Sequence, residues 1–234
     1  MNNKISSTIK LISVIFCMLC YTAAFAKVSP FSSSFVAYYD GKDVGEATLV
    51  LSHVKDSQYQ LSYVSKVSKF FLSDRRYETS IFEVEDNKLI PISYIYKREG
   101  TGSNKYLSVS FDRSSDTILV NEQPKFDWND EMDNQLFRVD LSQRLRDGDS
   151  EFSYDFINNR GEQKHYKLEV LGTDNLSLPY GSLSATKVKI NRETNKRVTY
   201  AWFAPDLDYS LVRFQQFKEG KEQGDIKLQA FTRE

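Results

Sequence analysis

The residue types that most often carry out catalysis or bind metals are scarce in this chain of 234 residues. It contains two histidines, His53 and His165, and two cysteines, Cys17 and Cys20. A zinc site needs three or four His, Cys or carboxylate ligands, and a Ser-His-Asp triad needs a histidine base. Neither an H-E-x-x-H nor a G-x-S-x-G motif occurs in the sequence. We therefore expect no metal site, no cofactor and no triad.

The two histidines have different settings in the sequence pattern. His165 falls on the charged face of an alternating stretch, 162–170, which favours a solvated surface residue. His53 is in register with Leu49 and Leu51 at the end of another alternating stretch. We interpret it as a partly buried, hydrogen-bonded side chain, with a ligand or a catalytic base as the alternative.

Acidic residues offer two further kinds of chemistry. The run from Asp127 to Asp133 places oxygen ligands at alternate positions, as in a calcium loop, but Met132 stands where the sharp-turn glycine belongs and Arg138 where the closing acid belongs. The acids of this run are better suited to the beginning of a helix. Two carboxylates for glycoside hydrolysis are defined by their separation in space, so the sequence cannot select them. We expect a protein that is not an enzyme, with a carboxylate-dependent hydrolase as the least favoured alternative.

The N-terminal 26 residues have the pattern of a secretory signal peptide. Lys4 and Lys10 are followed by an apolar block from Leu11 to about Tyr21 and by Ala24-Phe25-Ala26, a typical cleavage site. The apolar block is too short to span a bilayer, which needs about 20 residues. We therefore predict export to the periplasm and cleavage near residue 26.

Removal of this segment also removes both cysteines, so the mature chain has no thiol chemistry and no disulfide. Cys20 as the modified cysteine of a lipoprotein is the alternative, although Leu19 occupies a position that prefers a small residue. No later segment is apolar enough to span a membrane. The whole chain has a formal net charge of −1, which argues against a nucleic-acid partner, because such proteins carry a basic stripe.

Alternation of apolar and polar residues in short runs dominates the remaining chain. Examples are Leu107, Val109 and Phe111, and Tyr166, Leu168 and Val170, in runs that end at Gly, Asn, Asp or charged residues. This pattern indicates half-buried antiparallel strands joined by short turns. It predicts a mainly β fold with about 11–12 strands in a strongly curved antiparallel sheet or partial barrel, as a single domain over residues 27–234.

One helix interrupts this pattern, within about residues 130–147. Leu136, Phe137, Leu141 and Leu145 recur at helical spacing. Asp140 and Gln143 are spaced as a capping box, and Gly148 is a natural stop. The helix is expected to separate about seven N-terminal strands from about five C-terminal strands.

Several strands carry aromatic residues on a face that need not be the core. Two-faced strands in a curved sheet are either covered on both sides or line a cavity, and an apolar group followed by basic residues suits the rim of a lipid site. The alternative is that these side chains are simply core or a tucked loop. The candidate ligand-binding residues are Phe70, Phe71, Tyr94, Tyr96, Tyr200 and Trp202.

Segments along most of the mature chain resemble one known family. They are Tyr39-Asp40-Gly41 with Gly45, Leu89-Ile90-Pro91, Asp140-Leu141-Ser142, Leu178-Pro179-Tyr180-Gly181, and Tyr200 to Leu207 with its W-x-A-P-D element. Together they resemble the bacterial exported family called domain of unknown function 3108. Tyr209-Ser210-Leu211 departs from the pattern, since a proline is expected before the following strand.

The resemblance implies a periplasmic β-rich protein without an established activity, and it supplies no catalytic residues. In architecture the chain is also similar to the half-barrels of periplasmic lipoprotein carriers, which hold acyl chains between a curved sheet and helices. The motif residues Gly41, Gly45, Trp202, Pro205 and Asp206 are interpreted as structural, at turns and close backbone approaches.

Three functional hypotheses follow for the mature protein. The first is binding of a lipid or acyl chain, including that of a lipoprotein, in the concave face of the sheet. The second is an envelope-assembly or scaffold protein that acts through contacts with other envelope proteins. The third is the carboxylate-dependent hydrolase. The size and lining of the largest internal cavity distinguish them.

Overall fold

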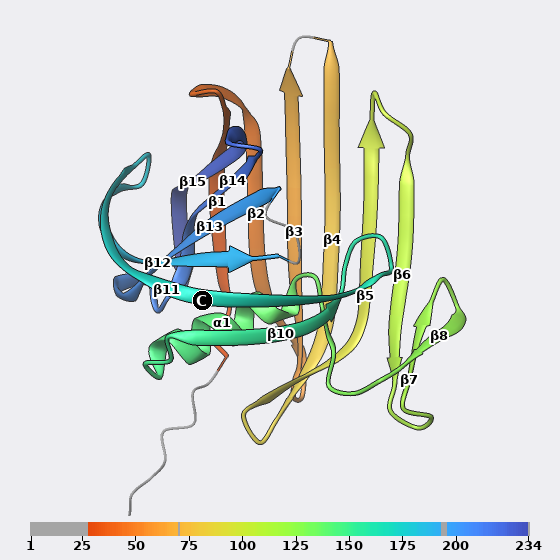
Figure 1. The fold of residues 1–234 in the computed structure, drawn as a ribbon. Coiled ribbons are helices and arrows are strands. Elements are labelled where there is room, and N and C mark those ends of the chain that lie inside the picture. The colour runs from red at the N-terminus through yellow and green to blue at the C-terminus, as the bar shows by residue number, and fades with distance from the viewer. Residues whose placement is uncertain (1–27, 70, 193–195, 234) are drawn as a thin grey trace, which may run out of the picture.

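The computed structural model describes residues 28–69, 71–192 and 196–233 (Figure 1). The predicted signal peptide, residues 1–26, lies outside this part of the chain. The described residues form fifteen strands, one α-helix and one short 3-10 helix. Within them, no helix is long and apolar enough to cross a bilayer.

A single sheet contains all the strands. Those before the helix are β1 (Phe31–Tyr39), β2 (Lys42–Lys55), β3 (Gln58–Lys69), β4 (Leu72–Glu85), β5 (Lys88–Gly100), β6 (Lys105–Asp112), β7 (Thr117–Val120), β8 (Gln123–Asp127) and β9 (Met132–Asp133). Those after it are β10 (Glu151–Ile157), β11 (Gln163–Leu178), β12 (Gly181–Asn191), β13 (Arg197–Ala204), β14 (Ser210–Lys218) and β15 (Lys221–Arg233).

The sheet is an antiparallel meander that is not closed into a barrel. Its order runs from β8 through β1 to β15 and on to β9, so β8 and β9 are its edges and only the short β9–β10 pair is parallel. The predicted curved antiparallel sheet is confirmed. The strand number is higher than the 11–12 expected, in part because β8 and β9 are five and two residues long, too short to show alternation.

Bulges help to curve the sheet. The register shifts at Ser34/Phe35, Ile81/Phe82, Val170/Gly172 and Trp202/Phe203, and each bulge increases the local twist. In Figure 1 β10 and β11 run across the nearly vertical β3 and β4 toward β5. The turn after β10 reaches β6 to β8, where Lys125 Nζ donates to the Gly161 carbonyl at 2.8 Å. The two ends of the sheet therefore lie close together, and the short segment 128–131 also joins β8 to β9.

Helix α1 (Leu136–Arg146) lies inside the curve of the sheet. It falls within the predicted range and ends before Gly148, whose φ is +94°. The predicted capping box at Asp140 was wrong, because Asp140 lies in the middle of the helix and accepts a hydrogen bond from Tyr154. Asp133 instead accepts the N–H groups of Gln135 and Leu136, at 2.8 and 2.9 Å.

The buried side chains form three clusters along the sheet. The first joins β1 to β4 with the C-terminal strands around Phe35, Leu61 and Leu228. The second packs the apolar face of α1, with Phe137 and Leu141, against β10 to β14. The third lies among β5 to β7 and includes residues Tyr94, Ile118 and Ile157. Because α1 fills only one part of the concave side, the rest of that side is open.

The motif residues of the sequence lie at turns and close approaches. Gly41 has a φ of +70° between β1 and β2, where a left-handed residue closes the hairpin. A Cβ at Gly45 would lie 2.1 Å from the backbone oxygen of Lys66 on β3, which only glycine allows. Pro205 and Asp206 begin a 3-10 turn, η1 (Pro205–Leu207), that leaves β13.

Candidate functional site

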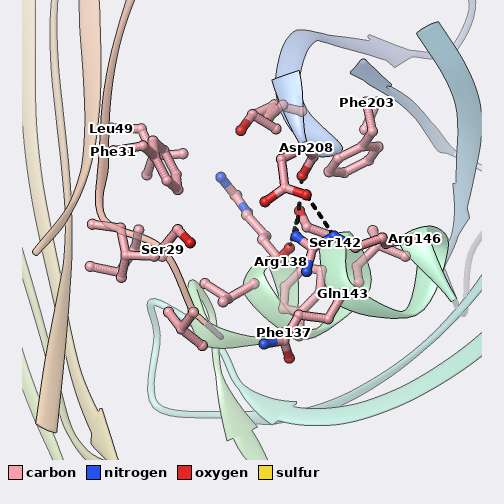
Figure 2. A pocket seen from close by; sticks show the side chains of 18 of the residues that line it. Ser29, Phe31, Leu49, Phe137, Arg138, Ser142, Gln143, Arg146, Phe203 and Asp208 are labelled. Carbon is pink, nitrogen blue, oxygen red and sulfur yellow. Dashed lines mark hydrogen bonds and ion pairs between the residues drawn. The ribbon is translucent and has the colours of Figure 1, made fainter. Parts of the chain in front are cut away.

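Three adjacent hollows lie on the concave side of the sheet. The first, here called the apolar cavity, has a volume of about 60 Å³ and lies between α1 and the strands (Figure 2). Leu141 of α1 faces strand residues across it. The strand side chains that make it apolar include Phe31, Leu49, Leu51, Leu61 and Phe203.

An ion pair closes one side of the apolar cavity. Arg146 of α1 lies 2.6 Å from the Asp208 carboxylate, and Arg233 lies 3.4 Å from it. Asp208 has a left-handed backbone, with a φ of +56°, just after η1. Figure 2 shows this pair beside Phe203, while Arg138 extends from α1 into the cavity.

The second hollow, here called the open chamber, has a volume of about 600 Å³ and lies between β1 to β4 and the strands β14 and β15. Its lining mixes apolar side chains such as Val67 and Leu72 with Asp74, Arg76 and Arg98. Burial opposes ionisation of Asp74, but hydrogen bonds from both arginines hold the pKa of its carboxyl below the usual value. The polar groups of this chamber thus largely neutralise one another.

The third hollow, here called the basic chamber, has a volume of about 540 Å³. Its two carboxylates are already hydrogen-bonded: Glu78 accepts from Tyr94 and Asn134, and Glu162 accepts from Asn158. Positive charge dominates this chamber because six cationic side chains line it against these two carboxylates. Its six cationic side chains are Arg76, Arg138, Arg160, Lys164, Arg192 and Arg197.

Phe214 of β14 borders all three hollows, and Arg138 borders both the apolar cavity and the basic chamber. The guanidinium of Arg138 lies 5.4 Å from the centre of the Phe214 ring, within range of a cation–π contact. The hollows are therefore neighbouring parts of one site. Their common boundary is an aromatic ring with a cation over it.

A buried polar network lies beside the basic chamber. Tyr94 donates to Glu78 at 2.5 Å, and Ser80 donates to Asp133 at 2.5 Å. Burial raises the pKa of the Tyr94 phenol and raises that of Asp133 to about 6. The network connects β4 and β5 to the beginning of α1, so it fixes the helix that carries Arg138.

The predicted ligand-binding residues are spread over the molecule. Tyr94 and Tyr96 are buried in the third cluster, and Phe71 is 98% exposed at the β3–β4 turn. Phe70 lies outside the described residues. None of the described ones lines the three hollows, and their part in ligand binding stays a prediction.

Strand β13 shows how the lining differs from the prediction. Tyr200 and Trp202 lie on the face where Trp202 donates to Asp174 at 2.9 Å and packs against Lys187. Ala201 and Phe203, the alternate residues, line the apolar cavity. Alternation separated these two sets, but only the curvature of the sheet shows which set faces inward.

The histidines and the acidic run have ordinary surroundings. His53 is exposed and hydrogen-bonds to the Asp56 carbonyl at 2.8 Å, so the expected partial burial was wrong. It pairs with Tyr59 of β3 near the end of the β2–β3 hairpin, and its ring packs edge-on against the Tyr59 ring, with centres 5.1 Å apart. His165 contacts Asp155 at 2.8 Å. Among the described residues, no group of three or more His, Cys, Asp or Glu side chains is placed to hold a metal ion.

Sequence reasoning missed the arginines that face the basic chamber. Arg138 comes from α1, Arg192 follows β12 and Arg197 begins β13. Arg138 is distant in sequence from the other two, so no local charge run indicates that it shares a chamber with them. The one available signal is that Arg138 directly follows the apolar pair Leu136-Phe137 on a helix expected to be buried.

Comparison with solved structures shows the fold. The "beta-barrel-like protein of domain of unknown function DUF1849" from Brucella abortus is similar, with a TM-score of 0.63 and 7% identity over 89% of this chain and 99% of that one. The Aeromonas veronii immune modulator A matches with a TM-score of only 0.25 and 8% identity, over 83% of this chain and 73% of that one. No curated protein matches the chain.

The sequence itself matches one family model, "Protein of unknown function (DUF3108)", over residues 34–226. This range runs from β1 into β15 and so includes the sheet and α1. It also includes every motif on which the resemblance in the sequence rests. The chain belongs to the DUF3108 family.

Proposed function

We propose that this protein is an exported periplasmic protein that binds a hydrophobic or amphipathic ligand, such as a lipid or an acyl chain, without catalysing a reaction. The observation that carries the proposal is the apolar cavity under α1, which adjoins two larger chambers on the concave side of one curved sheet. Ligand sites in proteins are hollows of roughly 300–1,000 Å³ with apolar walls and a few polar groups.

The dimensions of the hollows suit an elongated molecule better than a compact one. At about 60 Å³ the apolar cavity holds only a few atoms, whereas the chambers beside it measure about 600 and 540 Å³. A chain whose end enters the apolar cavity would continue past Phe214 into a chamber. Burial of each methylene contributes about 0.8 kcal/mol to binding.

Export rests on the pattern of residues 1–26. Fractionation of cells that express the full chain, followed by N-terminal sequencing, tests it. We expect the protein in the periplasmic fraction with an N-terminus close to residue 27. Recovery of the uncleaved chain from the cytoplasm would overturn this part of the proposal.

Native mass spectrometry and solvent extraction of the purified protein test ligand binding directly. Displacement of N-phenyl-1-naphthylamine, a neutral fluorescent probe, by dodecanol then measures affinity for an acyl chain. We expect Phe214→Ala to weaken dodecanol binding about tenfold, because burial of a Phe side chain is worth about 1.5–3 kcal/mol.

Phe217→Ala is the matched control. Phe217 is half-buried on the same strand, but it packs against Tyr200, with ring centres 6.3 Å apart, and does not line the hollows. Dodecanol affinity of this variant should equal that of the unaltered protein. Absence of co-purified lipid together with absence of probe binding would overturn the proposed function.

A second candidate function is a scaffold in envelope assembly. Phe71 and Leu72, at the tip of the β3–β4 hairpin, are 98% and 62% exposed, and exposed apolar groups mark contact surfaces. A photoreactive amino acid at position 71 should crosslink an envelope protein in cells, whereas the same group at exposed Asp116, on the β6–β7 turn, should not. Equal crosslinking from both positions would remove this candidate.

A further inference from the structure

The basic chamber contains guanidinium groups that the described residues do not neutralise. Arg76 has Asp74 as its partner at 2.6 Å, and Lys164 has Glu162 at 3.4 Å. For Arg138, Arg192 and Arg197, in contrast, no carboxylate within the described ranges forms an ion pair. Arg197 is exposed, but Arg138 and Arg192 are half-buried, and a half-buried charge without a partner of opposite charge is unusual.

Arg192 is held in place without being neutralised. Its guanidinium lies 5.3 Å from the centre of the Tyr166 ring and donates to the Thr199 hydroxyl at 3.3 Å. Its Nε is buried and has no hydrogen-bond partner among the described residues. Burial lowers the pKa of Arg192, and the nearby positive charges of Arg197 and Arg138 lower it further.

Arg138, which lines the same chamber, is also held by aromatic rings. It comes from α1, and its guanidinium stacks near Phe214, at 5.4 Å, and near Phe137, at 6.0 Å. The rings hold both guanidinium groups in place and leave N–H groups free to donate. Both groups line one chamber, so together they can bind an anion. Planar guanidinium groups bind phosphate or carboxylate oxygens through two parallel hydrogen bonds.

From this geometry we infer that the basic chamber binds the oxyanion headgroup of an amphipathic ligand through Arg138 and Arg192. The inference rests on the proposed function, because Arg138 also borders the apolar cavity. A headgroup at Arg138 therefore has an apolar recess within reach for its chain. Arg197 adds positive charge at the rim, and the chain as a whole has a net charge of −1, so this chamber is a local concentration of positive charge.

Three probes distinguish the contribution of the headgroup to affinity from that of the acyl chain. They are dodecyl phosphate, dodecanol and inorganic phosphate. The first two are measured by displacement of N-phenyl-1-naphthylamine, and the third by calorimetry, with the full chain expressed and the exported protein purified. We expect dodecyl phosphate to bind at least tenfold more tightly than either of the others, because a charge-assisted hydrogen bond is worth about 1.5–3 kcal/mol.

Arg138→Gln and Arg192→Gln should each weaken dodecyl phosphate binding about tenfold or more. Arg192 does not line the apolar cavity, so Arg192→Gln should leave dodecanol binding unchanged, which also shows that this variant is folded. Arg192→Lys should keep part of the dodecyl phosphate affinity that Arg192→Gln loses. The control is Arg75→Gln, which removes the same charge from an exposed position on β4 outside the hollows and should change neither affinity.

The outcomes distinguish this inference from the proposed function. If dodecanol binds as tightly as dodecyl phosphate, and neither arginine variant matters, the anion site is overturned while acyl-chain binding stands. If inorganic phosphate binds as tightly as dodecyl phosphate and the arginine variants weaken both, the anion is a free oxyanion. That result would overturn the amphipathic ligand and, with it, the proposed function.

Discussion

At the beginning of α1, the carboxyl group of Asp133 takes part in three hydrogen bonds. The donors are Ser80 and the N–H groups of Gln135 and Leu136, and the residue is fully buried. Hydrogen bonds favour the ionised carboxylate, but burial outweighs them and raises the pKa to about 6. This single residue connects β4 to the helix that carries Arg138.

The pKa of Asp133 predicts a dependence of stability on pH. The value of about 6 in the folded protein lies above the ordinary 3.8, so the folded state binds the proton more tightly. This contribution is complete below about pH 4 and is lost as pH rises through 6. Relative to Asp133→Asn, the unaltered protein should lose roughly 2 kcal/mol of unfolding free energy between pH 4 and 7.

Urea unfolding at several pH values measures this difference. Asparagine keeps an oxygen that can accept the helix N–H groups, so the fold should persist. Asp130→Asn, at an exposed position just before β9, is the control. Its unfolding free energy should differ from that of the unaltered protein by the same amount at every pH. The prediction would be contradicted if the unfolding free energies of Asp133→Asn and the unaltered protein differed by the same amount at every pH.

Individual residues were predicted from the sequence with uneven success. The inward face of β13 could not be chosen, because Tyr200 and Trp202 are as apolar as Ala201 and Phe203 and both faces of the strand are covered. Arg138 and Arg192 are 54 positions apart, and their proximity depends on where α1 lies in the curve. Turn residues such as Gly41, in contrast, act locally, so the sequence pattern identified them.

Among the elements, strands were predicted where alternation is long and missed where it is short. β3 and β11 have 12 and 16 residues and show their period clearly. β9 has two residues and depends on its parallel pairing with β10 through Met132 and Asp133. The helix was found from its apolar spacing, but it begins where Asp133, which also accepts a hydrogen bond from Ser80 of β4, accepts the N–H groups of Gln135 and Leu136.

At one end of their pairing, β2 and β3 approach each other so closely that β2 requires a glycine there. At Gly45 the φ is +148°, and a Cβ would lie 2.1 Å from the Lys66 backbone oxygen. Gly45→Ala should therefore lower the unfolding free energy by about 2 kcal/mol or more, because the backbone of β3 must move. Urea unfolding followed by circular dichroism measures this loss.

Gly224→Ala is the matched control within a strand. A Cβ at Gly224 of β15 would have no heavy atom within 4 Å, so its effect should stay within about 0.5 kcal/mol. Equal losses in the two variants would show that the contact with Lys66 is not what requires glycine at position 45.

At the scale of the whole molecule, one continuous ladder of strands joins all three clusters of buried residues. The two tryptophans report on different parts of it. Trp128 packs on Phe111 beside the third cluster, with ring centres 5.5 Å apart, and Trp202 belongs to the first. Since β3 to β5 connect these regions by direct pairing, we expect them to unfold together.

Variants with a single tryptophan test this cooperativity. In Trp128→Phe and in Trp202→Phe, the urea midpoint from the remaining tryptophan should coincide with the midpoint from circular dichroism of the same variant. A midpoint for Trp128 fluorescence clearly below that of circular dichroism would show that β5 to β8 unfold as a separate unit. Residues 27–234 would then not be the single domain predicted from the sequence.

The meeting point of the two sheet ends differs from every other boundary between neighbouring strands. Lys125 Nζ and the Gly161 carbonyl form a hydrogen bond there, and Gly161 packs tightly against Val120 and Leu107. A ladder between strands holds by many backbone hydrogen bonds, whereas this junction holds by side-chain contacts and by the short segment 128–131 that joins β8 to β9. The sheet is therefore closed at this point by side chains and one short loop rather than by backbone pairing, since β8 and β9 form no ladder with each other.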